Sequence, residues 1–198
     1  MMTETPRAPR SSGLRFEDCR LRPLGPEDQA RTLAWRNQDR VRANMYSDHL
    51  IGADEHARWF AGSMANPAAA YRIYEYQARP LGFVSFTGID RHNDRCSWAF
   101  YLGEADAPRG SGAAMELLAL DQVFGDLGIG KLCCEVFAFN AAVIRLHKRF
   151  GFVEEGRLVR HARKDDQLQD VVLLARFADG WGEDRPALMS TVFEGPPA

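Results

Sequence analysis

The chain has 198 residues, of which 45% are hydrophobic and 26% charged, and its 25 basic and 27 acidic side chains leave a formal net charge of −2. This length and apolar fraction suit one globular domain with a sizeable core, and they exclude disorder along most of the chain. The near-zero charge excludes a nucleic-acid binder that depends on a broad positive surface. No apolar run approaches the ~20 residues that span a membrane, and residues 1–13 lack the apolar core of a secretory signal. We therefore expect a cytoplasmic protein with no nucleic-acid or membrane partner.

The four cysteines predict neither a metal site nor a disulfide framework. Cys19, Cys96, Cys133 and Cys134 form no CxxC pair and have no histidine partners at metal-ligand spacing. We expect reduced, mostly buried thiols and no bound metal.

Polar segments stand at both ends of the chain. Residues 1–13 and 181–198 lack apolar periodicity, so we expect mobile tails on either side of one domain at 14–180. At the start of that domain the pattern predicts a strand over 14–23. A helix should follow, opened by Gly-Pro-Glu-Asp at 25–28 and ending near residue 37.

The next part of the chain predicts a helix and then three strands. Asp54 is the expected cap of the helix. Two strand-like runs, 71–77 and 81–89, are joined by Ala-Arg-Pro at 78–80, which is a hairpin signal. A third strand over 96–102 is strongly aromatic.

The second half repeats strand and helix at the spacing of an α/β unit. A glycine-rich turn at 109–112 leads into an amphipathic helix, and a strand follows over 131–137. Asn140 caps another helix, which Gly151 closes. Two final strands are expected over 152–160 and 170–177. The pattern as a whole predicts an α/β (α+β) fold, with a mixed sheet of six or seven strands and about four helices.

The sharpest motif is Arg-Gly-Ser-Gly-Ala-Ala at 109–114, between the aromatic strand and the long helix. Small residues let the backbone curl and leave N–H groups pointing outward, and a helix N-terminus behind them suits a diphosphate. The motif matches neither the P-loop nor GxGxxG. Taken alone, such a motif is more often an ordinary turn than a ligand site.

Two motifs together resemble a known family. Arg109-x-x-Gly112-x-Ala114 resembles the coenzyme A loop of the GCN5-related N-acetyltransferase (GNAT) superfamily, and the Asn-capped helix running into Gly-Phe at 140–152 resembles its second signature. The resemblance covers about 14–178. It implies the GNAT fold, in which two parallel strands, here 96–102 and 131–137, splay apart as a V, and it implies acetyl-CoA as co-substrate.

The resemblance also implies how the coenzyme is held. The pantetheine arm would bond to backbone groups freed by the splay, and the pyrophosphate would meet the backbone of the glycine-rich turn. The residues expected to bind the coenzyme are Phe100, Tyr101, Leu102, Arg109, Gly110, Ser111, Gly112, Ala113, Ala114 and Asn140.

Acetyl transfer needs a proton for the departing thiolate and a group that takes a proton from the amine. The family commonly places a Tyr where this chain has His147, which could still protonate sulfur. Glu135, on the splayed strand, is the candidate to take the amine proton through water. Ser85, on the strand that would edge the acceptor pocket, is a further catalytic candidate. His147 could equally be a surface histidine, and Glu135 a solvated carboxylate.

Three N-terminal segments bear on the acceptor. Trp-Arg-Asn at 35–37, Arg-Ala-Asn-Met-Tyr at 42–46 and Glu-His-x-x-Trp at 55–59 resemble the GNAT branch that acetylates the 4-amino group of a UDP-linked dideoxy sugar on the route to pseudaminic acid. Such a substrate would make this an enzyme of surface-glycan precursor synthesis.

The residue types in these segments suit a nucleotide sugar. Guanidinium groups form forked contacts with phosphate, and flat apolar side chains suit uracil. Arg36 and His56, with Arg42 less securely, could meet phosphate, and Tyr101 would project toward the same region. The candidate uracil platform consists of Met45, Tyr46 and Trp59.

Two other functions stay open. Ribosomal-protein N-terminal alanine acetyltransferases have similar openings, and Glu104, Asp106 and the acids at 165–166 could line a peptide groove. A non-catalytic acyl-CoA-binding regulator would explain His147 in place of Tyr. Members of the family often dimerise, so a homodimer is also an expectation.

Overall fold

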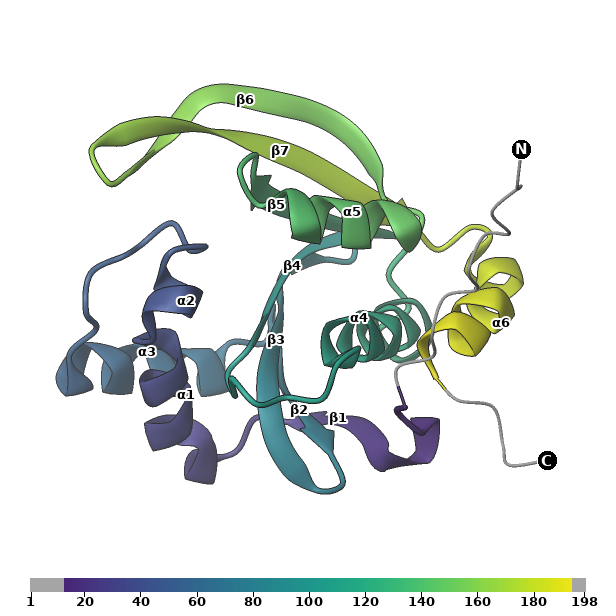
Figure 1. The fold of residues 1–198 in the computed structure, drawn as a ribbon, viewed down its shortest axis with the longest axis horizontal. Coiled ribbons are helices and arrows are strands. Elements are labelled where there is room, and N and C mark those ends of the chain that lie inside the picture. Colours follow the sequence, from purple (N-terminus) through teal and green to yellow (C-terminus); the bar gives the residue numbers. More distant parts are fainter. Residues whose placement is uncertain (1–12, 194–198) are drawn as a thin grey trace, which may run out of the picture.

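The computed structural model describes residues 13–193. Nearly all of the predicted N-terminal tail, residues 1–12, therefore lies outside the described residues. The chain forms one seven-stranded mixed sheet with the order β1-β2-β3-β4-β5-β7-β6 (Figure 1). The strands are β1 (Cys19–Pro23), β2 (Ala70–Tyr76), β3 (Arg79–Asp90), β4 (Arg95–Leu102), β5 (Lys131–Phe137), β6 (Val153–Lys164) and β7 (Gln167–Phe177).

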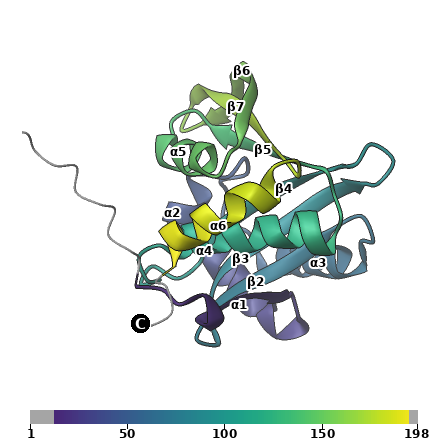
Figure 2. The same ribbon diagram turned by 90° about the vertical axis from the view of Figure 1, so that its right-hand side faces the viewer.

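Helices cover both faces of this sheet. The first three helices lie on one side of β2, β3 and β4, and α4 with α6 lies on the other (Figures 1 and 2). The predicted fold class is confirmed, although the described residues contain six α-helices where about four were predicted. They are α1 (Gln29–Arg36), α2 (Asp39–Arg42), α3 (Ala53–Ala65), α4 (Ser111–Asp121), α5 (Ala141–Arg149) and α6 (Trp181–Val192). Within residues 13–193 no helix has the length and apolar content needed to cross a bilayer.

The predicted C-terminal tail at 181–198 is wrong for its first twelve residues, which form α6. The apolar residues of this helix do not repeat at helical spacing, and it contains Pro186. It buries Trp181 and Val192 in the core, and Asp121 of α4 accepts from the Trp181 indole N–H at 3.1 Å and from two Arg185 nitrogens at 2.6 and 2.8 Å. Tertiary contacts therefore form a helix that local pattern does not predict.

Several predicted boundaries also move. The hairpin between β2 and β3 turns at Gln77 and Ala78, whose φ angles are 50° and 61°, and the predicted Ala-Arg-Pro turn is wrong because Arg79 and Pro80 already pair in the sheet. The segment before β1 forms a 3-10 turn (Phe16–Asp18), so the first strand begins at Cys19. Helix α3 follows Gly52, and Asp54 lies in its first turn.

The predicted splay between two parallel strands is confirmed. β4 and β5 pair only where Arg95, Cys96 and Ser97 meet residues 131–133. Beyond Ser97 no pairing joins them, while each strand keeps its antiparallel partner on the other edge. The facing backbone groups of the two strands are thus released from the sheet at its centre.

A buried ion-pair cluster anchors the start of α1 to the sheet. Asp28 is 0% exposed and accepts from two nitrogens of Arg22 at 2.6 and 2.8 Å, from Arg31 at 2.7 Å and from the backbone N–H of Gly25 at 3.0 Å. Burial acts to raise the pKa of Asp28, but the hydrogen bonds from Arg22 and Gly25 outweigh it and hold the pKa below its ordinary value.

Asp28→Asn is expected to lower the free energy of unfolding by about 3 kcal/mol at pH 7, because it removes the buried carboxylate that Arg22 and Arg31 share. The lowered pKa of Asp28 means that its stabilisation is present above the unfolded pKa of about 4 and is lost as pH falls through the folded value. Urea unfolding between pH 3 and 7 should therefore show a flatter acid limb in the variant. Glu27→Gln is the control, because that carboxylate is 66% exposed and 3.7 Å from the same Arg22. Equal losses in the two variants would contradict the assignment.

Candidate active site

A cavity of about 600 Å³ occupies the gap between β4 and β5. Its floor and walls come from both splayed strands, from α5 and from the segment 40–46, which follows α1. The N-terminal end of α4 borders the cavity at Gly112. Of the predicted site residues, this first cavity is lined by Met45, Tyr46, Phe100, Tyr101, Leu102, Gly112, Glu135, Asn140 and His147.

The glycine-rich turn presents free backbone donors beside this cavity. Gly110 has a φ of 95°, a left-handed conformation that favours glycine, and it directly precedes α4. The backbone N–H groups of Gly110, Gly112 and Ala113 have no backbone acceptor within residues 13–193. Donors at a helix N-terminus suit a diphosphate, and the exposed Arg109 side chain adds a cation at the same place.

Not every residue of the turn faces that side. The side chains of Ser111 and Ala114 are both 0% exposed and belong to the core face of α4. Their backbone N–H groups also donate within the protein, Ser111 to the Pro108 oxygen at 3.1 Å and Ala114 to the Gly110 oxygen at 2.9 Å, so the free donors of the turn are those of Gly110, Gly112 and Ala113.

Asn140 caps α5 as predicted. Its side chain accepts from the Val143 N–H at 3.4 Å and donates to the Asn44 side chain at 2.9 Å. Because Asn140 also lines the first cavity, it joins α5 to the segment 40–46 across the cavity edge.

His147 is 2% exposed and is therefore not a surface histidine. Its Nδ1 lies 2.8 Å from Oε1 of Glu116, a fully buried carboxylate on α4. The ring centroid is 5.4 Å from Trp98 and 4.8 Å from Phe152. Since Glu116 occupies Nδ1, Nε2 is the ring nitrogen left for the cavity that His147 lines.

Glu135 lies at the open side of the same cavity, where it is exposed. The Tyr46 hydroxyl donates to its carboxylate. Burial, together with that hydrogen bond, raises the pKa of Tyr46, so its phenol keeps its proton at neutral pH. An exposed carboxylate in the cavity wall can exchange protons with water.

A second cavity of about 280 Å³ adjoins the first. Met45, Ala99 and Tyr101 line both cavities and so form the boundary between them. The second cavity is further lined by Thr32, Arg36, Ser47, Ile51, Glu55, His56, Trp59, Phe83 and Ser85. The residues predicted to form a uracil platform are therefore divided between the two cavities. Tyr46 lines the first cavity, and Trp59 lines the second.

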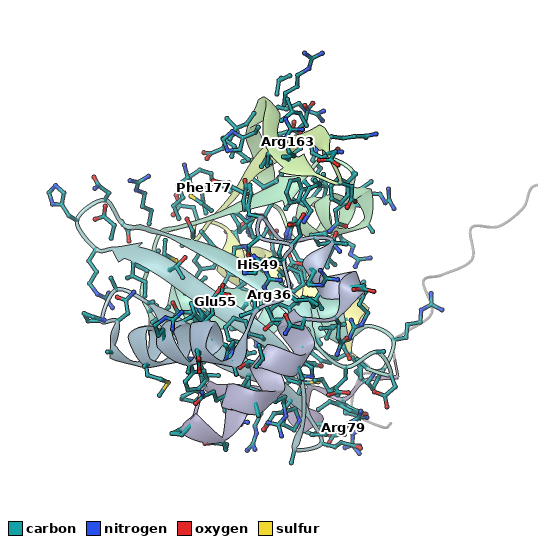
Figure 3. All side chains as sticks on the ribbon, turned by 90° about the vertical axis from the view of Figure 1, so that its left-hand side faces the viewer. Arg36, His49, Glu55, Arg79, Arg163 and Phe177 are labelled. Carbon is teal, nitrogen blue, oxygen red and sulfur yellow. The ribbon has the colours of Figure 1, made fainter. Side chains whose placement is uncertain are left out.

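Arg36 points a partly unpaired guanidinium toward the second cavity. Its Nη2 donates to the backbone oxygen and hydroxyl of Ser47 at 2.7 and 2.8 Å, while Nη1 is buried and has no hydrogen-bond partner within residues 13–193. Burial lowers the pKa of Arg36, although an arginine still keeps its charge. Arg42, by contrast, is engaged by the Asp39 side chain and the Asp48 backbone oxygen. Figure 3 shows Arg36 beside His49 and Glu55 in the middle of this face.

The predicted phosphate contact of His56 stays a prediction, although the surroundings of the ring do not favour it. The ring is 3% exposed, and burial lowers its pKa, so it is neutral near pH 7. The Thr32 hydroxyl donates to the Asp28 backbone oxygen at 2.9 Å, so it accepts from His56 Nε2 at 3.3 Å. The remaining nitrogen, Nδ1, then carries a lone pair, which does not bind a phosphate oxygen.

Ser85 is 8% exposed, and its hydroxyl donates to the Ala99 backbone oxygen at 3.3 Å. It lines the second cavity, as expected for the strand that edges the acceptor pocket. Its catalytic role stays a prediction.

The acids considered for a peptide groove lie elsewhere. Asp106 pairs with Arg79 at 2.6 Å, and Glu104 accepts the Trp35 indole N–H at 2.8 Å. Asp165 and Asp166 form the turn between β6 and β7. None of these four lines either cavity, and Figure 3 shows Arg79 far from Arg36 and Glu55.

Two residues of the site were not predicted. Lys164, 5% exposed, reaches from the end of β6 to the backbone oxygens of Met45 and Arg42 at 2.7 and 3.2 Å, so it ties the β6–β7 hairpin to the cavity edge. Glu116 is the other. A single carboxylate on the buried face of an otherwise apolar helix was the signal that could have revealed it.

A family model for the acetyltransferase (GNAT) domain matches residues 18–153. The chain belongs to the GNAT acetyltransferase family. A relative, the SPbeta prophage-derived uncharacterized N-acetyltransferase YokL of Bacillus subtilis (strain 168), is 29% identical over 145 residues, which cover 72% of this chain and 80% of YokL. Membership of this family makes the protein an acyltransferase.

Solved structures with the same fold include spermidine N-acetyltransferases of Vibrio cholerae. One, in complex with CoA and spermine, has a TM-score of 0.78 at 20% identity and covers 82% of this chain and 97% of its own. A dodecameric structure of spermidine N-acetyltransferase has a TM-score of 0.73 at 20% identity, covering 83% of this chain and 96% of its own. At these identities the likeness shows the fold. Within residues 13–193 the acetyltransferase has no cluster of three His, Cys, Asp or Glu side chains able to hold a metal ion.

Proposed function

We propose that this protein transfers an acetyl group from acetyl-CoA to the 4-amino group of a UDP-linked amino-dideoxy sugar. The observation that carries the proposal is the pair of adjoining cavities, which meet at Met45, Ala99 and Tyr101. One cavity runs from the glycine-rich turn into the splay, and the other opens among aromatic side chains and one buried guanidinium.

The first cavity suits acetyl-CoA. Unpaired N–H groups at the start of α4 can take the pyrophosphate, and the unpaired edges of β4 and β5 can bond to the amides of the pantetheine arm. Aromatic and aliphatic side chains, Trp98, Phe100 and Leu146 among them, supply the apolar wall.

The chemistry follows from these placements. The acceptor amine attacks the thioester carbonyl carbon near the boundary of the two cavities, and the carbon–sulfur bond then breaks. His147 gives a proton to the departing thiolate from Nε2, and Glu135 takes the proton lost by the amine through water. A general acid in this role accelerates the reaction by about 10²–10⁴.

The second cavity supports a nucleotide sugar. Arg36 Nη1, buried without a partner, can bind a phosphate oxygen. The rings of Tyr101 and Phe83 are stacked 5.3 Å apart and offer an apolar wall to a sugar ring. Trp59 is 41% exposed at the rim, where it can stack on uracil.

A polyamine such as spermidine is the second candidate acceptor. Glu55 lines the second cavity, and Glu135 and Glu155 line the first. These carboxylates could pair with ammonium groups, and structural neighbours in the family carry the name spermidine N-acetyltransferase.

A thiol-release assay tests the proposed function. The protein is incubated with acetyl-CoA and, separately, with the UDP-4-amino sugar, spermidine, or a peptide that begins with alanine. We expect kcat/KM for the UDP-sugar to exceed the values for spermidine and for the peptide by about 100-fold. This ratio corresponds to the two charge-assisted contacts that those acceptors lack. Turnover confined to spermidine or to the peptide would overturn the sugar assignment. Coenzyme binding without thiol release on any amine would favour a regulator.

Arg36→Gln is expected to raise KM for the UDP-sugar about 10- to 30-fold, because a charge-assisted hydrogen bond to phosphate is lost. The affinity for coenzyme A should stay the same, since Arg36 lines only the second cavity. Steady-state kinetics and calorimetry measure the two effects. Arg58→Gln on α3 is the matched control, because that side chain lines neither cavity. An unchanged KM in Arg36→Gln would place the diphosphate elsewhere.

A further inference from the structure

Glu116 is a buried carboxylate beside the first cavity to which the chemistry above assigns no role. It is 0% exposed, and the buried residues around it on α4 are almost all apolar. One oxygen lies 2.8 Å from His147 Nδ1, and the other is buried without a hydrogen-bond partner within residues 13–193. A lone buried carboxylate is strongly destabilising, so its hydrogen bond to His147 decides in which protonation state it exists.

The surroundings of the pair favour a state without net charge. The His147 ring packs against Trp98, Phe100 and Phe152, none of which is charged. Burial raises the pKa of Glu116, which the hydrogen bond and charge of His147 and the charge of Arg149 on α5 partly offset. From β5, the Cys134 thiol faces Glu116, and burial raises the pKa of that thiol, so it is neutral.

We propose that Glu116 is a positioning residue, which holds His147 in the doubly protonated form from which Nε2 releases a proton to the departing thiolate. The proposal rests on the acetyl transfer proposed above. We call the state that is ready to give a proton the loaded state. In this state the Glu116–His147 pair holds two protons: one lies between Nδ1 and Oε1, and the other is on Nε2. The carboxylate and the imidazolium together then carry no net charge, which is the state that burial favours.

The protons balance over one turnover of the enzyme. The amine forms a bond to the carbonyl carbon, the carbon–sulfur bond breaks, and sulfur keeps the electron pair and takes the Nε2 proton. The pair is left with one shared proton and a charge of −1. It then recovers a proton from water, which receives the one that the amine loses through Glu135.

Glu116→Gln tests this role, because the side chain keeps its shape and loses its charge. Without the carboxylate, the doubly protonated ring would be a buried cation, so the loaded state is disfavoured. We expect kcat at pH 7.5 to fall about 10- to 100-fold, with KM for acetyl-CoA within about threefold of the wild type. The deficit should shrink as pH is lowered, because solution protons then load the ring.

Two comparisons separate this role from a merely structural one. In a His147→Gln background the Glu116→Gln change should cause no further loss of kcat, because the group it acts through is gone. Glu154→Gln is the matched control: this exposed carboxylate pairs with Lys148 on the same helix at 2.9 Å, and its loss should leave kcat unchanged. Additive losses in the double variant would overturn the proposal.

A nitrogen-15 spectrum of the histidine rings gives a readout that needs no acceptor. The His147 signals are assigned by their absence in His147→Gln, and at neutral pH we expect Glu116→Gln to move them toward those of a ring with a single proton. Identical His147 signals in the two proteins would overturn the proposal, as would shifted signals with an unchanged kcat and pH profile. If the wild type releases no thiol with any amine, the proposed function fails, and the spectrum still decides whether Glu116 holds the second proton.

Discussion

His147→Gln is expected to lower kcat by about 100- to 1000-fold while KM for acetyl-CoA changes less than about threefold. The amide retains a hydrogen-bond donor near the position of Nε2 but cannot release a proton to sulfur, so the departing thiolate loses its acid. A loss confined to kcat is what removal of a transition-state interaction produces. Initial rates of thiol release over a range of acetyl-CoA concentrations measure both constants.

The control for this variant is His92→Gln. His92 is exposed in the turn between β3 and β4 and lines neither cavity. It should retain wild-type kcat. Thermal unfolding of His147→Gln should remain cooperative, which excludes loss of the fold as the cause. A kcat within about threefold of the wild type in a folded His147→Gln would remove His147 from the mechanism.

Gly112→Val is expected to weaken coenzyme A binding by at least about tenfold, which corresponds to about 1.4 kcal/mol. A Cβ at this position would meet only Leu146 Cδ2, at 4.0 Å, so the substitution has room within the protein. Because Gly112 lines the first cavity at the start of α4, the added methyl groups would occupy the space that the pyrophosphate needs. Isothermal titration with coenzyme A measures the change, and thermal unfolding should shift little.

Gly62→Val on α3 is the matched control, since a Cβ there meets nothing within 4 Å and the residue lines neither cavity. It adds the same side chain to a helix without touching the proposed site. If Gly112→Val bound coenzyme A as tightly as Gly62→Val does, the pyrophosphate could not lie against the start of α4.

Elements with strong local signals were predictable from the sequence. The strand at 131–137 has the predicted bounds, and Asn140 caps α5 through its own side chain, as its residue type favours. The order of the two GNAT motifs was also readable, and with it the fold and the acyltransferase class. Each of these features depends on residues close together in the chain.

Elements stabilised by distant partners were not predictable. Helix α6 is held by the burial of Trp181 and Val192 in the core and by the contacts of Trp181 and Arg185 with Asp121, about 60 residues earlier in the chain. Its own residues alternate too irregularly to show a helical face, and Pro186 argues against a helix. The local sequence pattern of a segment does not reveal an ion pair with a residue so far away in the chain.

The candidate site divides in the same way. The backbone donors of the glycine-rich turn follow from local geometry, whereas the roles of individual side chains depend on their neighbours. His56 shares a helix face with Trp59, as its spacing predicts, but its burial beside Thr32 lowers its pKa, which the spacing alone could not show. Tyr46 meets Glu135 from 89 residues away and is separated from Trp59.

The order of residues along the chain was enough to show a GNAT acyltransferase, with a glycine-rich turn ahead of one helix and an Asn cap on a later one. Those features can be recognised from residue types and short spacings, because turns, caps and helix termini are stabilised by groups a few positions apart. The burial of His147 against Glu116 and the meeting of two cavities at Tyr101 became visible in the folded chain alone. The protonation state of a buried group depends on burial and on the charges around it, and both are set by segments that the chain brings together only when it folds.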